Sequence, residues 1–261
     1  MPRSPTCRPC RSCARAAWWP TSWPQWPAST RSWAGSTDDQ REESPMPLTD
    51  QTVAEARDLA ARYPQPRSAL LPMLHLVQSE EGMITGAAIE LCADVLDLTT
   101  AEVTAVATFY TMYRQRSEGG THHIGVCTNT LCGLLGGDAV YEALSRRLGV
   151  GHNETTEDGA FTLERIECQA ACTYAPVMTV DWEFFDQMTI ESAMTVIDRL
   201  VAGDEVIATR GPAVRGWRAA ERTVAGIDDG LAGEGGGADA VMLAGLTVAR
   251  ERGMSAPGKA D

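Results

Sequence analysis

The chain has 261 residues, a formal net charge of −13 and 44% apolar side chains, which allows one or two packed domains with tails. The acidic balance argues against a nucleic-acid-binding role, because no basic surface is left over. No apolar run approaches the roughly eighteen residues of a membrane helix. The eight cysteines are too sparse for a secreted disulfide scaffold and fit a reducing compartment.

Residues 1–45 show no periodicity. They contain Cys7, Cys10 and Cys13, five of the seven tryptophans and many prolines. The segment lacks the apolar region of a signal peptide. We expect a disordered leader. The alternatives are a metal-binding tract at the three cysteines and a translation start at Met46.

Residues 46–118 have the pattern of a helical bundle with short connections. The expected helices span about residues 50–62, 68–82 and 86–97, with a fourth that begins at Thr99. Ser68 is expected to cap the second helix, and Thr99 and Glu102 to form a capping box at the start of the fourth.

Several side chains in this bundle are candidates for a functional role. His75 and Cys92 are interpreted as packing residues, since a single His or Cys on a helix is more often structural. An aromatic cluster near the end of the bundle predicts either core packing or a docking surface. Its members are Phe109, Tyr110, Met112 and Tyr113.

Residues 119–203 change to an α/β pattern with helices packed on a small mixed sheet. The expected order is strand, helix, strand, cysteine loop, strand, strand, helix. The strands span about 121–126, 161–167 and 177–181, with another at Phe184-Phe185, and the helices span about 137–148 and 189–201. Residues 151–160 are expected to form a polar loop.

Four cysteines in this region form two pairs. Cys127 and Cys132 are separated by four residues, and Cys168 and Cys172 by three. Each pair follows an expected strand, so both loops can emerge at one end of the sheet. Four converging thiolates suit zinc or an iron–sulfur cluster. Because neither pair has two intervening residues, spacing alone leaves open an iron–sulfur cluster, zinc, disulfides and unligated thiols.

Residues 204–261 lose the regular pattern. They contain a glycine-rich stretch at 233–237 and one apolar patch at 240–248. We expect a mostly disordered tail with a short helix. The alternative is a segment that orders against a partner subunit through Trp217, or through Leu243 and Leu246.

Three sequence motifs together resemble those of one protein family. They are Cys127-Thr-Asn-Thr-Leu-Cys132, Glu167-Cys-Gln-Ala-Ala-Cys-Thr-Tyr-Ala-Pro-Val-Met178 and Ala105-Val-Ala-Thr-Phe-Tyr-Thr-Met112. The family is the thioredoxin-like 2Fe–2S ferredoxin that forms the E subunit of NADH–quinone oxidoreductase, respiratory complex I. The resemblance covers roughly residues 48–203.

This resemblance implies that Cys127, Cys132, Cys168 and Cys172 bind one 2Fe–2S cluster. It implies an α/β fold class, with an N-terminal helical bundle at 46–118 followed by a thioredoxin-like ferredoxin domain at 119–203. It also suggests a cis bond between Ala175 and Pro176, as thioredoxin-like domains usually have there. Many members have Gly within the second pair and often just after it. This chain has Ala170, Ala171 and Thr173 at those places.

The implied function is one-electron transfer in the NADH-oxidising module of the complex. The expected partners are the flavin-carrying subunit that binds NADH and FMN, and other peripheral-arm subunits. The implied location is cytoplasmic, peripheral to the inner face of the cell membrane through the complex. Three alternatives remain open: the same module in an NAD-linked hydrogenase or formate dehydrogenase, a zinc-stabilised interaction module without redox chemistry, and a thiol–disulfide oxidoreductase.

Overall fold

The computed structural model describes residues 48–115, 119–231, 233–235 and 237–255. Contacts divide the chain into residues 1–43 and residues 44–261, and all described residues belong to the second unit. The predicted leader, its three cysteines and the alternative start at Met46 lie outside the described residues.

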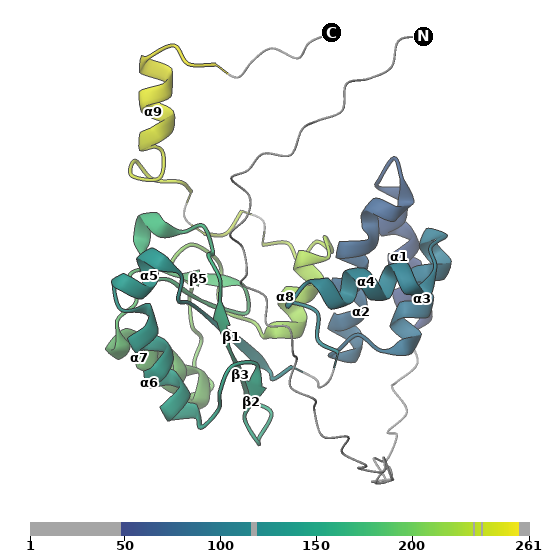
Figure 1. The fold of residues 1–261 in the computed structure, drawn as a ribbon, viewed down its shortest axis with the longest axis horizontal. Helices are drawn as coiled ribbons and strands as arrows, with labels where there is room; N and C mark the ends of the chain where they lie inside the picture. The colour runs from purple at the N-terminus through teal and green to yellow at the C-terminus, as the bar shows by residue number, and fades with distance from the viewer. Residues whose placement is uncertain (1–47, 116–118, 232, 236, 256–261) are drawn as a thin grey trace, which may run out of the picture. The chain divides into compact units, whose positions relative to one another are not determined.

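The N-terminal part is a bundle of α-helices, as predicted (Figure 1). Its helices are α1 (Asp50–Ala61), α2 (Leu70–Glu81), α3 (Gly86–Leu96) and α4 (Thr100–Phe109). The capping box of Thr99 and Glu102 is confirmed, and Gly82 ends α2 with a φ of 77°. The prediction that Ser68 caps the second helix is wrong, because the 3-10 helix η1 (Pro66–Ala69) precedes α2.

The bundle core is apolar. The burial of each side chain in it decides between core packing and a functional role, the two interpretations that the sequence left open. Cys92 is fully buried in this core, so its interpretation as a packing residue is confirmed. The aromatic cluster is divided. Tyr113 is buried and its hydroxyl donates to the carbonyl of Leu71 at 2.9 Å, whereas Phe109 is 76% exposed.

The second half of the chain forms a mixed sheet with strand order β2-β3-β1-β4-β5. The strands are β1 (His122–Cys127), β2 (Glu154–Thr155), β3 (Phe161–Ile166), β4 (Met178–Val180) and β5 (Glu183–Phe185). β1 and β3 run parallel, and the other neighbouring strands are antiparallel. The short β2 lies where only a polar loop was expected.

Helices cover the sheet as the α/β prediction required. Helix α6 (Gly137–Leu148) packs against β1 and β3 and also contacts α7 (Ile190–Ala202) (Figure 1). Thr189 caps α7 as predicted, and the Ala175–Pro176 bond is cis as predicted. The core between them is apolar and includes Ile124, Leu144, Leu163, Met178 and Ile197.

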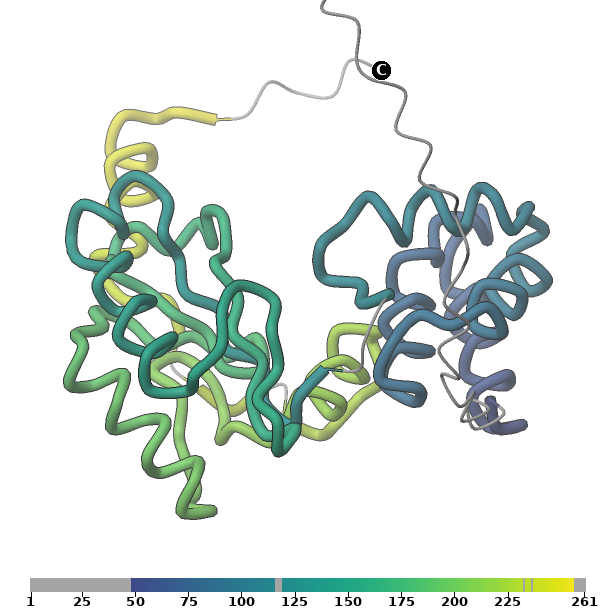
Figure 2. Tube along the Cα trace, turned by 60° about the horizontal axis from the view of Figure 1, so that its bottom comes forward, coloured from purple at the N-terminus to yellow at the C-terminus, as the bar shows by residue number. Residues whose placement is uncertain are grey.

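Residues 204–227 correct the expectation of a mostly disordered tail. Val206 and Ala208 join the core of the sheet, and Trp217 is only 1% exposed. Helix α8 (Trp217–Val224) lies beside the N-terminal helices, where it packs against α2 (Figure 2). In α8 the apolar residues Trp217, Ala220 and Val224 recur at helical spacing, a local signal that the expectation of disorder overlooked. Further on, α9 (Ala244–Glu251) is the expected short helix, and none of its residues is buried.

A carboxylate in α8 joins the two halves of the chain. Glu221 has no exposed surface. Its Oε2 lies 2.6 Å from Nδ1 of His75 and accepts from Nε2 of Gln78 at 2.9 Å, both on α2. Its Oε1 accepts from the indole N–H of Trp182 at 2.8 Å, in the turn between β4 and β5. His75 is therefore a structural residue, and we call this group the Glu221 junction.

Candidate metal centre

The two cysteine loops leave the same end of the sheet. Cys127 ends β1, and in the parallel pairing it lies opposite Ile166, the last residue of β3. Cys168 lies two residues after the end of β3, and Cys172 begins the 3-10 helix η2 (Cys172–Tyr174). Cys132 lies in α5 (Thr130–Leu134), a short helix that the sequence did not predict. The parallel register therefore brings the two loops together.

Within this site the cysteines form two close pairs. Cys127 and Cys132 lie together in one small buried cluster, and the sulfur atoms of Cys168 and Cys172 are 4.0 Å apart. Cys172 also interacts electrostatically with Cys127 and Cys132, so the pairs lie near each other. The structure thus brings together all four cysteines singled out in the sequence.

The two pairs differ in exposure, and one thiol in each pair has a raised pKa. Cys127 and Cys132 are each 2% exposed, whereas Cys168 and Cys172 lie at the surface. Burial raises the pKa of the Cys132 thiol to about 11. The hydrogen bond with Cys168 raises the pKa of the Cys172 thiol. A bound metal cation reverses this preference by favouring thiolates.

The donor set fits a binuclear iron–sulfur group. Two thiolates on one tetrahedral metal lie about 3.8 Å apart when each bond is about 2.3 Å, close to the 4.0 Å between Cys168 and Cys172. No group of three or more His, Cys, Asp or Glu residues in the described ranges is placed to hold a single ion. Two close pairs match a two-iron cluster, in which each iron takes two protein sulfurs.

Backbone groups interact with two of the cysteine thiols. The N–H of Ala170 donates to the sulfur of Cys168 at 3.3 Å, and the backbone of Val177 partly offsets the rise in the pKa of the Cys132 thiol. Such contacts stabilise ligand thiolates and tune the bound metal. Ala170 reaches this position with a left-handed φ of 54°, where glycine is favoured. The departure from the family pattern therefore falls on a residue with glycine-like backbone geometry.

A glycine lets α6 start directly on the first cysteine loop. A Cβ added at Gly137 would lie 2.4 Å from the carbonyl oxygen of Cys127 and 2.9 Å from that of Cys132. No side chain fits in that space, so glycine is required for the backbones to pack this closely.

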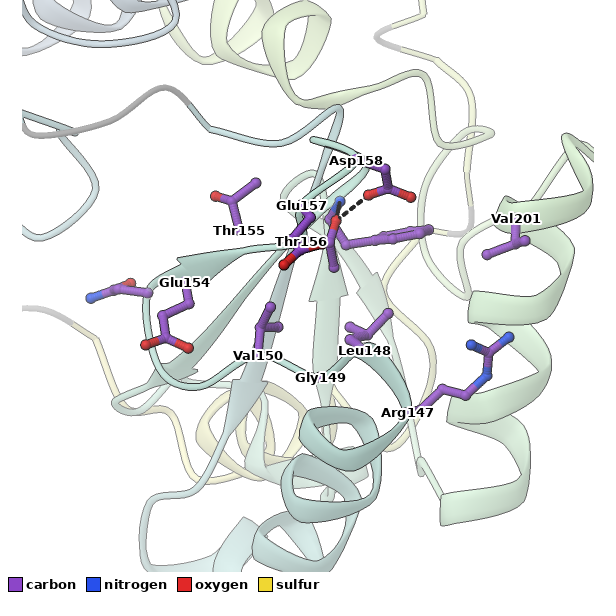
Figure 3. A pocket seen from close by; sticks show the side chains of 12 residues that line it. Arg147, Leu148, Gly149, Val150, Glu154, Thr155, Thr156, Glu157, Asp158 and Val201 are labelled. Atoms are coloured by element: carbon purple, nitrogen blue, oxygen red, sulfur yellow. Dashed lines mark hydrogen bonds between the residues drawn. The ribbon is translucent and has the colours of Figure 1, made fainter. Parts of the chain in front are cut away.

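A cavity in the described residues lies away from the cysteines. It encloses about 950 Å³ and is bordered by residues including Arg147, Glu154, Asp158 and Val201 (Figure 3). Phe161, which begins β3, also lines it, so the cavity lies at the opposite end of the strand from the cysteine loop. None of the predicted site residues borders this cavity.

The sequence did not reveal the polar groups that support the second cysteine loop. Tyr174, two residues after Cys172, donates its hydroxyl to Asp239. The guanidinium of Arg210 lies 5.7 Å from the centre of the Tyr174 ring. Arg210 and Asp239 belong to the segment expected to be disordered, and no local pattern marks either of them.

Comparison with known proteins agrees with this geometry. Residues 56–201 match the family model described as "Thioredoxin-like [2Fe-2S] ferredoxin". The chain belongs to this ferredoxin family. The resemblance seen in the sequence is thereby confirmed, together with the α/β fold class, and the family is one of iron–sulfur proteins.

Two curated relatives of this ferredoxin carry the same name. The E subunit of NADH-quinone oxidoreductase from Mycobacterium tuberculosis strain H37Rv is 53% identical over 204 residues, covering 78% of this chain and 81% of the relative. The E subunit from Rickettsia conorii is 39% identical over 148 residues, covering 56% and 88%. Both relatives are named as subunits of an oxidoreductase.

Two solved structures are also similar to parts of this ferredoxin, at lower sequence identity. The air-oxidised NAD⁺-reducing [NiFe]-hydrogenase has a TM-score of 0.46 and 17% identity, covering 51% of this chain and 23% of that chain. The wild-type thioredoxin-like [2Fe-2S] ferredoxin from Aquifex aeolicus has a TM-score of 0.28 and 18% identity, covering 33% and 91%. In the described ranges, none of the helices combines the length and apolar character that crossing a membrane requires.

Proposed function

We propose that this chain is a one-electron carrier that holds one [2Fe–2S] cluster on Cys127, Cys132, Cys168 and Cys172. The convergence of the two cysteine pairs at one end of the sheet carries this proposal. Membership of the ferredoxin family supports it. When bound, such a cluster supplies an acceptor for a single electron.

The two pairs have different tasks in this proposal. Cys127 and Cys132 anchor the group in an apolar environment and keep water from its inner side. Cys168 and Cys172 face the surface, where an electron can be exchanged with a partner. The backbone groups of Ala170 and Val177 favour the thiolate of one cysteine in each pair. The net charge of −13 disfavours a further negative charge, so we expect a potential on the order of −400 mV.

The proposed setting is the NADH-oxidising module of NADH–quinone oxidoreductase. There the chain exchanges its electron with the FMN of a partner subunit that also binds NADH. The names of the curated relatives support this assignment. The sequence contains no dinucleotide-binding fingerprint, in keeping with NADH and FMN on the partner. Association with the inner face of the membrane then follows through the complex.

The test of the cluster is spectroscopic. Anaerobically purified protein is examined by visible absorption and by low-temperature EPR before and after reduction with dithionite. We expect a red-brown protein with a spin-one-half signal in the reduced state. The signal should be lost in Cys127→Ala and Cys168→Ala and kept in Cys92→Ala, a cysteine buried in the bundle core. A colourless, EPR-silent protein with stoichiometric zinc would overturn the proposal.

The parent complex requires a second measurement. A tagged chain expressed in its own host is purified from the membrane fraction with mild detergent. We expect it to co-purify with a flavoprotein that oxidises NADH and with quinone reductase activity. Co-purification with a hydrogenase or formate dehydrogenase would keep the electron carrier but reject complex I as its setting.

A further inference from the structure

Arg210 lies over the ring of Tyr174, two residues after Cys172, although it is far from the cysteines in the sequence. It is delivered by a hairpin at residues 206–214, in which the N–H of Val214 donates to the carbonyl of Val206 at 2.8 Å. The hairpin is tied to β5 by the N–H of Thr209, which donates to the carbonyl of Phe184 at 2.9 Å. The segment after α7 is therefore built onto the ferredoxin sheet at the end of β5.

The guanidinium of Arg210 is held by two aromatic rings and one carboxylate. It lies 4.9 Å from the centre of the Phe184 ring and 5.7 Å from that of Tyr174. Its Nε donates to Asp186 at 2.6 Å, and its Nη2 donates to the second carboxylate oxygen. The side chain of Asp186 is 7% exposed. This two-bond geometry fixes the position of the charge.

Both rings connect Arg210 to the cysteines. Phe184 packs on the small apolar cluster that contains Cys127 and Cys132. Tyr174 belongs to η2, which Cys172 begins, and its carbonyl accepts from the N–H of Gln187 at 2.9 Å. One side chain thus reaches the inner pair through Phe184 and the outer pair through Tyr174.

The sign of the electrostatic effect follows from charge alone. Reduction of a cluster adds one negative charge, and a fixed cation nearby favours the reduced state. Arg stays charged at every accessible pH. Two carboxylates near Tyr174, Asp186 and Asp239, oppose it. The balance among these three groups determines the local charge beside the site.

We propose that Arg210 is a positioning residue that places a fixed positive charge behind the cysteine loops and raises the midpoint potential of the cluster. The role of Asp186 is to orient that charge and partly offset it. This inference rests on the proposed function, because it requires a bound cluster. It assigns a redox role to the segment after α7, which contributes no cluster ligand.

A charge series in the full chain tests the proposal. Midpoint potentials are measured by EPR-monitored redox titration for Arg210→Gln, Asp186→Asn and the double variant. We expect a negative shift for Arg210→Gln, a positive shift for Asp186→Asn and a potential near the wild-type value for the double variant. Arg210→Lys keeps the charge and should stay near the wild-type potential. It should lose iron faster to a chelator, because Lys cannot stack on both rings with the planar group of Arg.

The matched control is another Arg–Asp pair. Arg147 and Asp198 form an ion pair of 2.9 Å, and Arg147 borders the remote cavity. Arg147→Gln should leave the potential unchanged. A wild-type potential in Arg210→Gln at full cluster content, or shifts of the same sign in both single variants, would overturn the inference. Absence of the reduced EPR signal from the wild-type chain would instead reject the proposed function.

Discussion

The cysteine site and the Glu221 junction are both built from residues far apart in the sequence. They differ in whether their polar groups are exposed to solvent. At the junction, Glu221 is fully buried and accepts from the indole of Trp182 and the amide of Gln78. At the cysteine site, Cys168 and Cys172 remain exposed. A polar centre that is closed and internally satisfied stabilises the fold, whereas one with exposed thiols is suited to bind a group from outside.

Removing the carboxylate of the junction should cause the largest loss of stability. Glu221→Ala removes the carboxylate that pairs with His75, Gln78 and Trp182 and opens a cavity. We expect the free energy of unfolding to fall by about 3–5 kcal/mol. Urea unfolding of the iron-free chain, followed by far-UV circular dichroism, measures this change.

The control for this variant is an exposed acidic residue in α9. Glu251→Ala changes the charge by the same amount but removes no buried contact. It should alter the free energy of unfolding by less than about 0.5 kcal/mol. Equal effects of Glu221→Ala and Glu251→Ala would mean that the junction does not stabilise the fold.

Thiol alkylation should separate open from closed cysteines. Burial raises the pKa of the Cys92 thiol to about 12, so almost no reactive thiolate is present at pH 8. In the iron-free chain we expect iodoacetamide to label Cys168 and Cys172 at least about 100-fold faster than Cys92. Mass spectrometry of tryptic peptides gives each rate. The difference should disappear in 8 M urea (about the concentration that unfolds most domains), and similar native rates would contradict the assigned burial.

The indole of the junction allows a finer test. Trp182→Phe removes the N–H donor to Glu221 but keeps a ring next to His123, whose ring centre is 5.1 Å away. We expect a loss of about 1–2 kcal/mol in the free energy of unfolding. In the Glu221→Ala background the same change should cost much less, because the acceptor is already gone. If the losses in the free energy of unfolding were additive in this double-mutant cycle, the hydrogen bond between Trp182 and Glu221 would contribute nothing to stability.

The smallest effect is expected within the second cysteine loop. Ala170 has a left-handed φ of 54°, which disfavours a side chain. Ala170→Gly should therefore stabilise the iron-free chain by about 0.5 kcal/mol, after the entropy of glycine in the unfolded state is subtracted. Thermal unfolding measures the gain. At Ala171, where φ is −106°, the same substitution should destabilise, and a gain at both positions would reject the strain argument.

Much of the fold could be predicted because the signals are local. The capping box of Thr99 and Glu102, the glycine that ends α2 and the Thr189 cap each depend on residues a few positions apart. The short elements were missed for the same reason. β2 has two residues and α5 has five, too few for a periodic pattern.

The place of the candidate site was predictable, but its supporting residues were not. Four cysteines at distinctive spacings after two strands gave the proposed ligand set, and parallel pairing of β1 with β3 brings the loops together. The exposure difference between Cys132 and Cys168 depends on what packs around each loop. That information is not contained in the spacing.

By itself, the sequence determined the class of this protein: a helical bundle, an α/β ferredoxin domain and four cysteines at one end of its sheet. Only the tertiary structure decided what the segment after α7 does. Glu221 meets His75 across 146 positions of the chain, and Arg210 meets Asp186 across 24. Local patterns record how one segment folds. Contacts between distant segments are instead selected by packing and by the need to satisfy buried polar groups.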